Sequence, residues 1–345
     1  MKSRYLLASL ALALTSSALS LFPLHAEEKV LTLYTQRHYG FDQELTGKFE
    51  EETGIEVRVV KAGADELIAR LEQEGENTPA DLFMTADAGG LSRAAEAGLL
   101  QPIRDHEEAL EPVPDRLHHP EGLWTAITQR ARVFAYAKDR VNPEELSTYQ
   151  DLADPEWKGR IVIRSSSNIY NQSLMTTLIE ANGADAALEW AKAVRDNMAR
   201  PPQGSDRDQI RAVAAGLADV ALVNTYYLGL LENSSEQKDR DAAAAVGIIY
   251  PNQEDRGAHV NISGIGVVKA SDQPELAAKF IEFHLTPEVQ AGYPENTYEF
   301  PVVEGVPWSE TQERWGKFKA DDVSLSILGD RNAEAVRIFN EAGWE

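Results

Sequence analysis

The sequence predicts an α/β protein built as two lobes. Segments typical of β-strands alternate with amphipathic helical segments along the chain, which is the pattern of a parallel sheet covered by helices. The chain has 345 residues, and about 320 remain once a predicted leader is removed, enough for two hydrophobic cores. No repeat and no linker rich in Pro, Gly or Ser interrupts the mature chain. We therefore expect the chain to cross between the lobes on ordered segments, near 125–135 and again near 255–265.

The first lobe is predicted from strands and helices at the N-terminal end. Apolar and polar residues alternate in 55–60, which indicates a half-buried strand, and Gly54 ends the helix before it. The expected elements are a strand at 30–34, a helix at 41–52, a strand at 55–60, a helix at 64–74 and a strand at 80–84.

The second lobe is predicted to begin near residues 157–160. The expected elements of this lobe are a strand at 161–163, helices at 171–180 and 209–215, and a strand at 219–223. A strand at 262–268 and a helix at 275–285 follow them along the chain. The expected division gives the first lobe residues 27–128 plus about 262–314, and the second lobe about 129–261 plus about 315–345.

The first 26 residues have the features of an export signal peptide. Lys2 and Arg4 form a positively charged start, residues 6–14 an apolar run, and residues 24–26 a plausible cleavage site. The apolar run is too short for a good membrane span. We therefore expect a periplasmic protein with no membrane-spanning segment after the signal is removed.

The charge and the absence of cysteine exclude several classes of partner and site. The full chain carries a net charge of −23, and loss of Lys2 and Arg4 lowers it to about −25. Such a surface argues against nucleic acid or anionic lipid as a partner. Because the chain has no cysteine, it forms neither disulfides nor thiolate metal sites.

The adjacent pair Tyr226 and Tyr227 follows the buried strand predicted at 219–223. At a strand-to-helix junction both phenol oxygens can converge on one small target. Tyrosine has a pKa near 10, so two converging phenols favour a cation that displaces their protons, and ferric iron is the natural candidate. For an isolated pair, packing with one ring inward and one outward would be the better interpretation.

Two further clusters are placed like this pair. His38 and Tyr39 follow the first strand, and Tyr170 follows the strand at 161–163 with helix-start residues before it. All three clusters thus fall at the carboxyl end of a strand entering a helix, where open α/β sheets bind ligands. Helix N-termini at that edge favour anionic phenolates. Together the clusters favour a metal site.

The charges of these side chains fit a ferric ion. His38 offers a neutral imidazole, and Tyr39, Tyr170, Tyr226 and Tyr227 offer four phenolates, so a ferric centre would sum to −1. Arg37 or Arg130 could offset that charge, although a structural or solvated guanidinium is an equal alternative for either one. Hard oxygen donors suit a hard ion, and because such ligands lose protons on binding, affinity should fall in acid.

The motifs around these residues resemble the ferric-iron-binding periplasmic proteins of ABC importers. The segments that carry the resemblance are QRHY at 36–39, RSSSNIYNQS at 164–173 and NTYY at 224–227, and the likeness extends over essentially the whole mature chain. It is strongest to the cyanobacterial and marine type, which ligates iron with one histidine and four tyrosines.

The resemblance implies a two-lobed clamshell with two crossing hinge strands and a metal bound in the cleft without a required carbonate. His38 and Tyr39 would come from the first lobe, and Tyr170, Tyr226 and Tyr227 from the second. Arg130 matches a cleft arginine of such proteins. The chain departs from some relatives at Leu230, where they carry a basic residue three positions after the second tyrosine.

Other polar clusters are weaker candidates. Residues 65–66 and 105–108 are expected to be solvated charges, His118 and His119 lack a second matching cluster, and His259 is expected to be structural. No Gly-x-Ser-x-Gly elbow and no His-Glu-x-x-His helix occurs in the sequence, so nothing supports a hydrolase or a zinc protease.

The sequence therefore predicts a monomeric binding protein, not an enzyme, that carries Fe³⁺ to the inner-membrane permease of an ABC iron importer. Fe²⁺ is the alternative oxidation state of the cargo. A protein of the same fold for a polyamine or an oxyanion remains an alternative, and a secreted iron-dependent redox enzyme is a weaker one.

Overall fold

The computed structural model describes residues 29–103 and 110–344. The predicted signal peptide at 1–26 and the acidic segment at 105–108 lie outside these residues. Within the described part of the chain, no helix is both long and apolar enough to cross a membrane.

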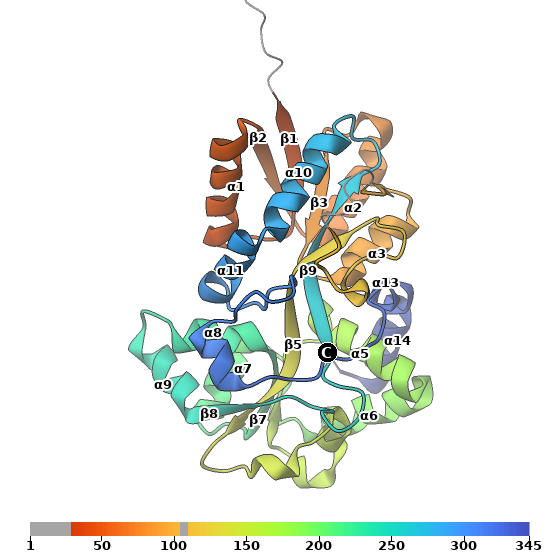
Figure 1. The fold of residues 1–345 in the computed structure, drawn as a ribbon. Helices are drawn as coiled ribbons and strands as arrows, with labels where there is room; N and C mark the ends of the chain where they lie inside the picture. The colour runs from red at the N-terminus through yellow and green to blue at the C-terminus, as the bar shows by residue number, and fades with distance from the viewer. Residues whose placement is uncertain (1–28, 104–109, 345) are drawn as a thin grey trace, which may run out of the picture.

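One end of the molecule holds the elements predicted for the first lobe (Figure 1). β1 (Val30–Thr35) lies between β2 (Glu56–Lys61) and β3 (Leu82–Thr85) and is parallel to both. The helices here are α1 (Gly40–Thr53), α2 (Ala64–Glu74), α3 (Ala88–Glu96), α10 (Pro274–Leu285) and α11 (Pro287–Asn296). α1 and α10 cover one side of these strands, while α2 and α3 cover the other.

The other end holds the elements predicted for the second lobe. β7 (Val220–Asn224) is parallel to β6 (Ile161–Val162). The surrounding elements are α5 (Ile169–Asn182), α6 (Ala184–Asn197), α7 (Asp206–Ala214), α8 (Thr225–Glu232), α9 (Gln237–Ala245), β8 (Val246–Ile249) and α14 (Asn332–Ala342). The predicted strands and helices are therefore present, with bounds that differ by a few residues.

Two long strands connect the ends of the molecule. β5 (Thr125–Ala137) and β9 (Val260–Val268) pair antiparallel with each other, and Arg130 lies opposite Asn261. β9 also pairs with β3 and with the short β4 (Leu100–Gln101), whereas the second half of β5 pairs with β7 and β8. The described strands thus form one curled sheet in the order β2-β1-β3-β9-β5-β7-β6. The prediction of a two-lobed α/β fold with two crossing strands is confirmed.

Separate hydrophobic cores stabilise the two ends. In the first, Phe49 of α1 meets Phe280 of α10 edge-on, with ring centroids 4.9 Å apart. In the second, Trp190 and Trp344 pack beside Phe339 of α14. A further cluster in the second lobe packs around β5, β7 and α8. Each lobe therefore has its own packed core, as its length permits.

The C-terminal segment contacts both lobes. After α12 (Glu310–Trp315), the short α13 (Ile327–Asp330) packs on α3 and α5. Its approach to α3 is so close that a Cβ on Gly329 would lie 2.6 Å from the Cβ of Ser92, and only glycine fits there. α14 then packs on α5 and α6.

Candidate metal site

The three tyrosine clusters each lie at a helix N-terminus, as their sequence context predicts. Tyr39 precedes the first residue of α1, Tyr170 is the second residue of α5, and Tyr226 and Tyr227 lie in the first turn of α8. The cap of α5 is Asn168, whose side chain accepts a hydrogen bond from the backbone N–H of Tyr170 at 3.0 Å. The positive end of each helix dipole therefore faces the phenol side chains.

These side chains meet at one cavity. The phenol oxygens of Tyr226 and Tyr170 are 3.3 Å apart, and the rings of Tyr226 and Tyr227 have centroids 4.2 Å apart. The rings of His38 and Tyr39 are stacked at 5.4 Å. A cavity of about 230 Å³ is lined by Gln36, Arg37, His38, Tyr39, Ala86, Tyr170, Ser205, Arg207 and Tyr227. Tyr226 is buried beside it, so the structure brings all five predicted ligand residues together.

Three of the four phenols have raised pKa values, so Tyr39, Tyr226 and Tyr227 are protonated at neutral pH when no cation is present. Burial raises the pKa of Tyr227 to about 12, and the nearby Tyr170 adds to the effect. Burial also raises the pKa of Tyr226 and of Tyr39, and both are raised further by neighbouring phenols of the same cavity. The groups are thus close enough that ionising them together requires a cation between them.

Arg37 supports the loop that carries His38 and Tyr39. It is 1% exposed, and its guanidinium donates to Asp42 at 2.8 Å and to Glu299 at 2.9 Å. The guanidinium carbon lies 5.1 Å from the ring centroid of Tyr39. Arg37 therefore holds the loop in place, and two carboxylates already oppose its charge.

Arg130 lies on the crossing strand β5 and connects the two lobes. It donates a hydrogen bond to the carbonyl of Ala86, and its guanidinium carbon is 5.5 Å from the ring centroid of Tyr170. Next to Ala86, the buried Asp87 accepts hydrogen bonds from Ser173 of α5 at 2.7 Å and from Asn261 of β9 at 2.6 Å. These contacts join the first-lobe loop at 86–87 to the helix that carries Tyr170.

Sequence reasoning missed a buried charged group beside the tyrosines. Asp206 of α7, fully buried, pairs with Arg132 at 2.6 Å and with Arg164 at 3.4 Å. It also accepts a hydrogen bond from the backbone N–H of Asn224, at the entrance to α8. Arg164 directly follows the strand predicted at 161–163, and this position could have indicated that it lies near the site. The part played by Asp206 depends on α7 packing beside β7, and no local pattern indicates it.

The sequence profile of the family described as "Bacterial extracellular solute-binding protein" matches residues 77–320. This chain belongs to that family. It is 50% identical over 320 residues to "Iron uptake protein A1" of Synechocystis, a match that covers 92% of this chain and 88% of the relative.

Solved structures of this family agree in fold over nearly the whole chain. A Trichodesmium protein in complex with iron and citrate is 49% identical, with a TM-score of 0.87 over 92% of this chain and 100% of its own. A ferric binding protein from Campylobacter jejuni is 44% identical, with a TM-score of 0.87 over 91% of this chain and 100% of its own. The chain is a solute-binding transport protein and not an enzyme.

Elsewhere in this solute-binding protein, the weaker candidates do not gather metal ligands. His118 lies 3.6 Å from Asp115, but the described residues contain no group of three His, Cys, Asp or Glu side chains that could hold a metal. His259 is fully buried, which lowers its pKa well below the usual range, and its backbone N–H donates to Tyr149. The position of His259 is therefore structural.

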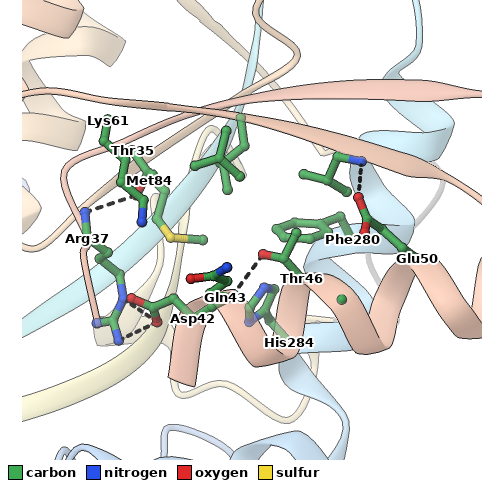
Figure 2. Close-up of a pocket in the computed structure, with 14 residues that line it drawn as sticks. Thr35, Arg37, Asp42, Gln43, Thr46, Glu50, Lys61, Met84, Phe280 and His284 are labelled. Atoms are coloured by element: carbon green, nitrogen blue, oxygen red, sulfur yellow. Dashed lines mark hydrogen bonds and ion pairs between the residues drawn. The ribbon is translucent and has the colours of Figure 1, made fainter. Parts of the chain in front are cut away.

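A larger cavity, about 490 Å³, is lined by residues of α1, β1, β2 and α10 (Figure 2). Its lining includes apolar residues such as Leu33, Met84 and Phe280, and also both members of the ion pair of Arg37 with Asp42. Its volume exceeds that of the tyrosine cavity, but its lining brings no phenols together. The tyrosine cavity is therefore the better candidate for the binding site.

Proposed function

We propose that this protein binds ferric iron between its lobes and delivers it to the inner-membrane permease of an ABC importer. The ligands are His38 and Tyr39 from the first lobe and Tyr170, Tyr226 and Tyr227 from the second. Arg37 and Arg130 lie next to these ligands. The observation that carries the proposal is the convergence of tyrosines from three helix N-termini: three of them line one cavity, and the oxygen of the fourth, Tyr226, lies 3.3 Å from that of Tyr170.

The donor set supports a hard trivalent ion. Phenolate oxygens bind hard cations, and soft ions prefer sulfur. At neutral pH the raised pKa values of Tyr39, Tyr226 and Tyr227 keep these phenols protonated, so the metal must displace their protons. A ferric ion has the charge to do this, whereas a divalent ion has less. Binding of Fe³⁺ is therefore favoured over binding of Fe²⁺.

The proposed route begins in the periplasm. The relatives are named for iron uptake and ferric iron binding, which supports the same cargo here. We propose that the signal at 1–26 directs export and that the mature protein acts as a monomer. Its lobes would be formed by 27–128 plus about 262–314 and by about 129–261 plus about 315–345, each a domain of ordinary size. Closure of the two lobes on the ion would hold the ligands of both lobes in the arrangement seen here, and opening would release it.

The lining of the cavity argues against the other solutes. A polyamine site needs carboxylates with aromatic side chains, but the cavity is lined by Arg37 and Arg207 and by no carboxylate. An oxyanion site would use backbone N–H groups and arginines, and four converging phenols would serve no purpose in it.

Loading with iron tests the proposal. Apo protein mixed with ferric citrate should gain one iron per chain and a red to orange phenolate-to-iron charge-transfer band. The variant Tyr250→Phe is a suitable control, because Tyr250 is a partly buried tyrosine whose hydroxyl is outside the cavity. A wild-type protein that stays colourless after ferric loading would refute the proposed function.

A further inference from the structure

The ligands of the proposed iron centre leave a charge that must be balanced. This inference rests on the proposed function, in which one ferric ion meets four phenolates and a neutral imidazole, for a net charge of −1. The cavity is small, and Tyr226 is buried beside it, so an unbalanced charge costs more there than in water. A cationic group next to the phenolates would therefore strengthen iron binding.

The two arginines expected from the sequence already face carboxylates. Arg37 pairs with both Asp42 and Glu299, so this group carries a net charge of −1. Arg130 lies close enough to Asp87 to oppose the effect of burial on the pKa of that carboxyl. Arg37 therefore adds no net positive charge to the centre, and the charge of Arg130 is opposed in part by Asp87.

The buried Arg132–Asp206–Arg164 group is different, because two guanidinium groups share one carboxylate and its net charge is +1. Arg132 makes the shorter contact with Asp206, at 2.6 Å against 3.4 Å for Arg164. Asp206 also accepts from the backbone N–H of Asn224 at 2.8 Å. The carboxylate of Asp206 is thus paired mainly with groups other than Arg164, which leaves the charge of Arg164 only partly opposed.

The guanidinium of Arg164 lies close to the tyrosines. Its side chain is 18% exposed, and its guanidinium carbon lies 5.5 Å from the ring centroid of Tyr170. After Asp206, its electrostatic partners are Tyr227 and Tyr170. Arg207, which also lines the cavity, lies with its guanidinium carbon 5.8 Å from the ring centroid of Tyr227 and adds to the same positive field.

We propose that Arg164 offsets the negative charge of the iron–tyrosinate centre and positions Tyr170 and Tyr227 at it. A positive charge at this place stabilises phenolate oxygens, and so it strengthens ferric binding. It stabilises the reduced centre even more, because that centre carries one more negative charge. Arg164 therefore also raises the reduction potential of the bound iron.

Substitution of Arg164 tests both effects. Arg164→Gln and Arg164→Met remove the charge with side chains of different shape, and Arg164→Lys keeps it. Arg337→Gln is the matched control, because Arg337 lies on α14 with 59% of its side chain exposed. Ferric affinity is measured by competition with citrate, and the reduction potential by spectroelectrochemistry, in which the electrode supplies the electron.

The neutral variants should bind ferric iron about tenfold more weakly, which is about 1.4 kcal/mol, and show a more negative potential. Arg164→Lys and the control should stay near wild type in both. Neutral variants with the affinity and the reduction potential of wild type would overturn the inference. It would also be overturned if the only change in these variants were a lower melting temperature of the apo protein. If wild-type protein bound no iron, the proposed function itself would fail, which is a separate outcome.

Discussion

Tyr226→Phe separates a role in metal binding from a role in packing. Tyr226 is 1% exposed, and its ring packs against that of Tyr227. Phenylalanine keeps the ring and removes only the hydroxyl, whose hydrogen-bond partner is the phenol of Tyr170 at 3.3 Å. The substitution therefore removes one long hydrogen bond from the apo fold and one anionic ligand from the iron complex.

The two losses differ in size. A single neutral hydrogen bond contributes about 1 kcal/mol to stability, and a long one contributes less. The apo protein should therefore unfold with a free energy within about 1 kcal/mol of wild type. Loss of a direct ligand should exceed the roughly 10–100-fold effect of outer partners, so we expect at least a 100-fold weaker affinity for ferric iron.

Two assays measure these quantities on the same samples. Urea unfolding followed by circular dichroism gives the stability of the apo protein, and citrate competition followed by the charge-transfer band gives the affinity. The control Tyr250→Phe removes a buried hydroxyl that has no partner among the described residues, so its stability should be equal or higher and its iron affinity unchanged. A Tyr226→Phe protein that binds iron normally but unfolds easily would show that the pair serves packing.

Four further predictions follow from the same structure. Burial, with Arg37 nearby, lowers the pKa of His284 to about 3, whereas the same side chain in the unfolded protein takes up a proton near pH 6.5. As the pH is lowered from 6.5 to 3, the free energy of unfolding should therefore decrease by about 1.4 kcal/mol per pH unit. His284→Phe should flatten that dependence in urea titrations. Iron should leave on acidification because the phenolates regain protons, and a charge-transfer band that persists until the circular dichroism signal collapses would contradict this. Tyr149 donates to the carbonyl of Arg132 at 2.6 Å and accepts from the N–H of His259 at 3.0 Å, so Tyr149→Phe should cost about 1–3 kcal/mol of stability with unchanged iron affinity. Small-angle scattering should give a smaller radius of gyration with iron than without it, and equal values would argue against closure on the metal.

Much of the fold could be predicted because its signals are local. The alternation in 55–60 and the glycine at 54 fix a strand and the end of a helix through the periodicity of their own backbone, and β2 and α1 lie where these signals place them. The candidate metal ligands could also be predicted, because their signals are local too. Each cluster consists of a few consecutive residues at a strand-to-helix junction. Such junctions lie at the carboxyl edge of a sheet, where ligands bind.

The sequence by itself thus determined the α/β elements, the absence of thiolate chemistry and the tyrosines that could meet at one site. The tertiary structure decided which charges surround them. Arg37 is opposed by Glu299, which lies 262 positions away along the chain. Asp206 of α7 joins Arg132 of β5 to Arg164 of the loop before α5. Such partners are set by the packing of helices on the curled sheet, because an ion pair depends on distance in space and leaves no periodic pattern in the chain.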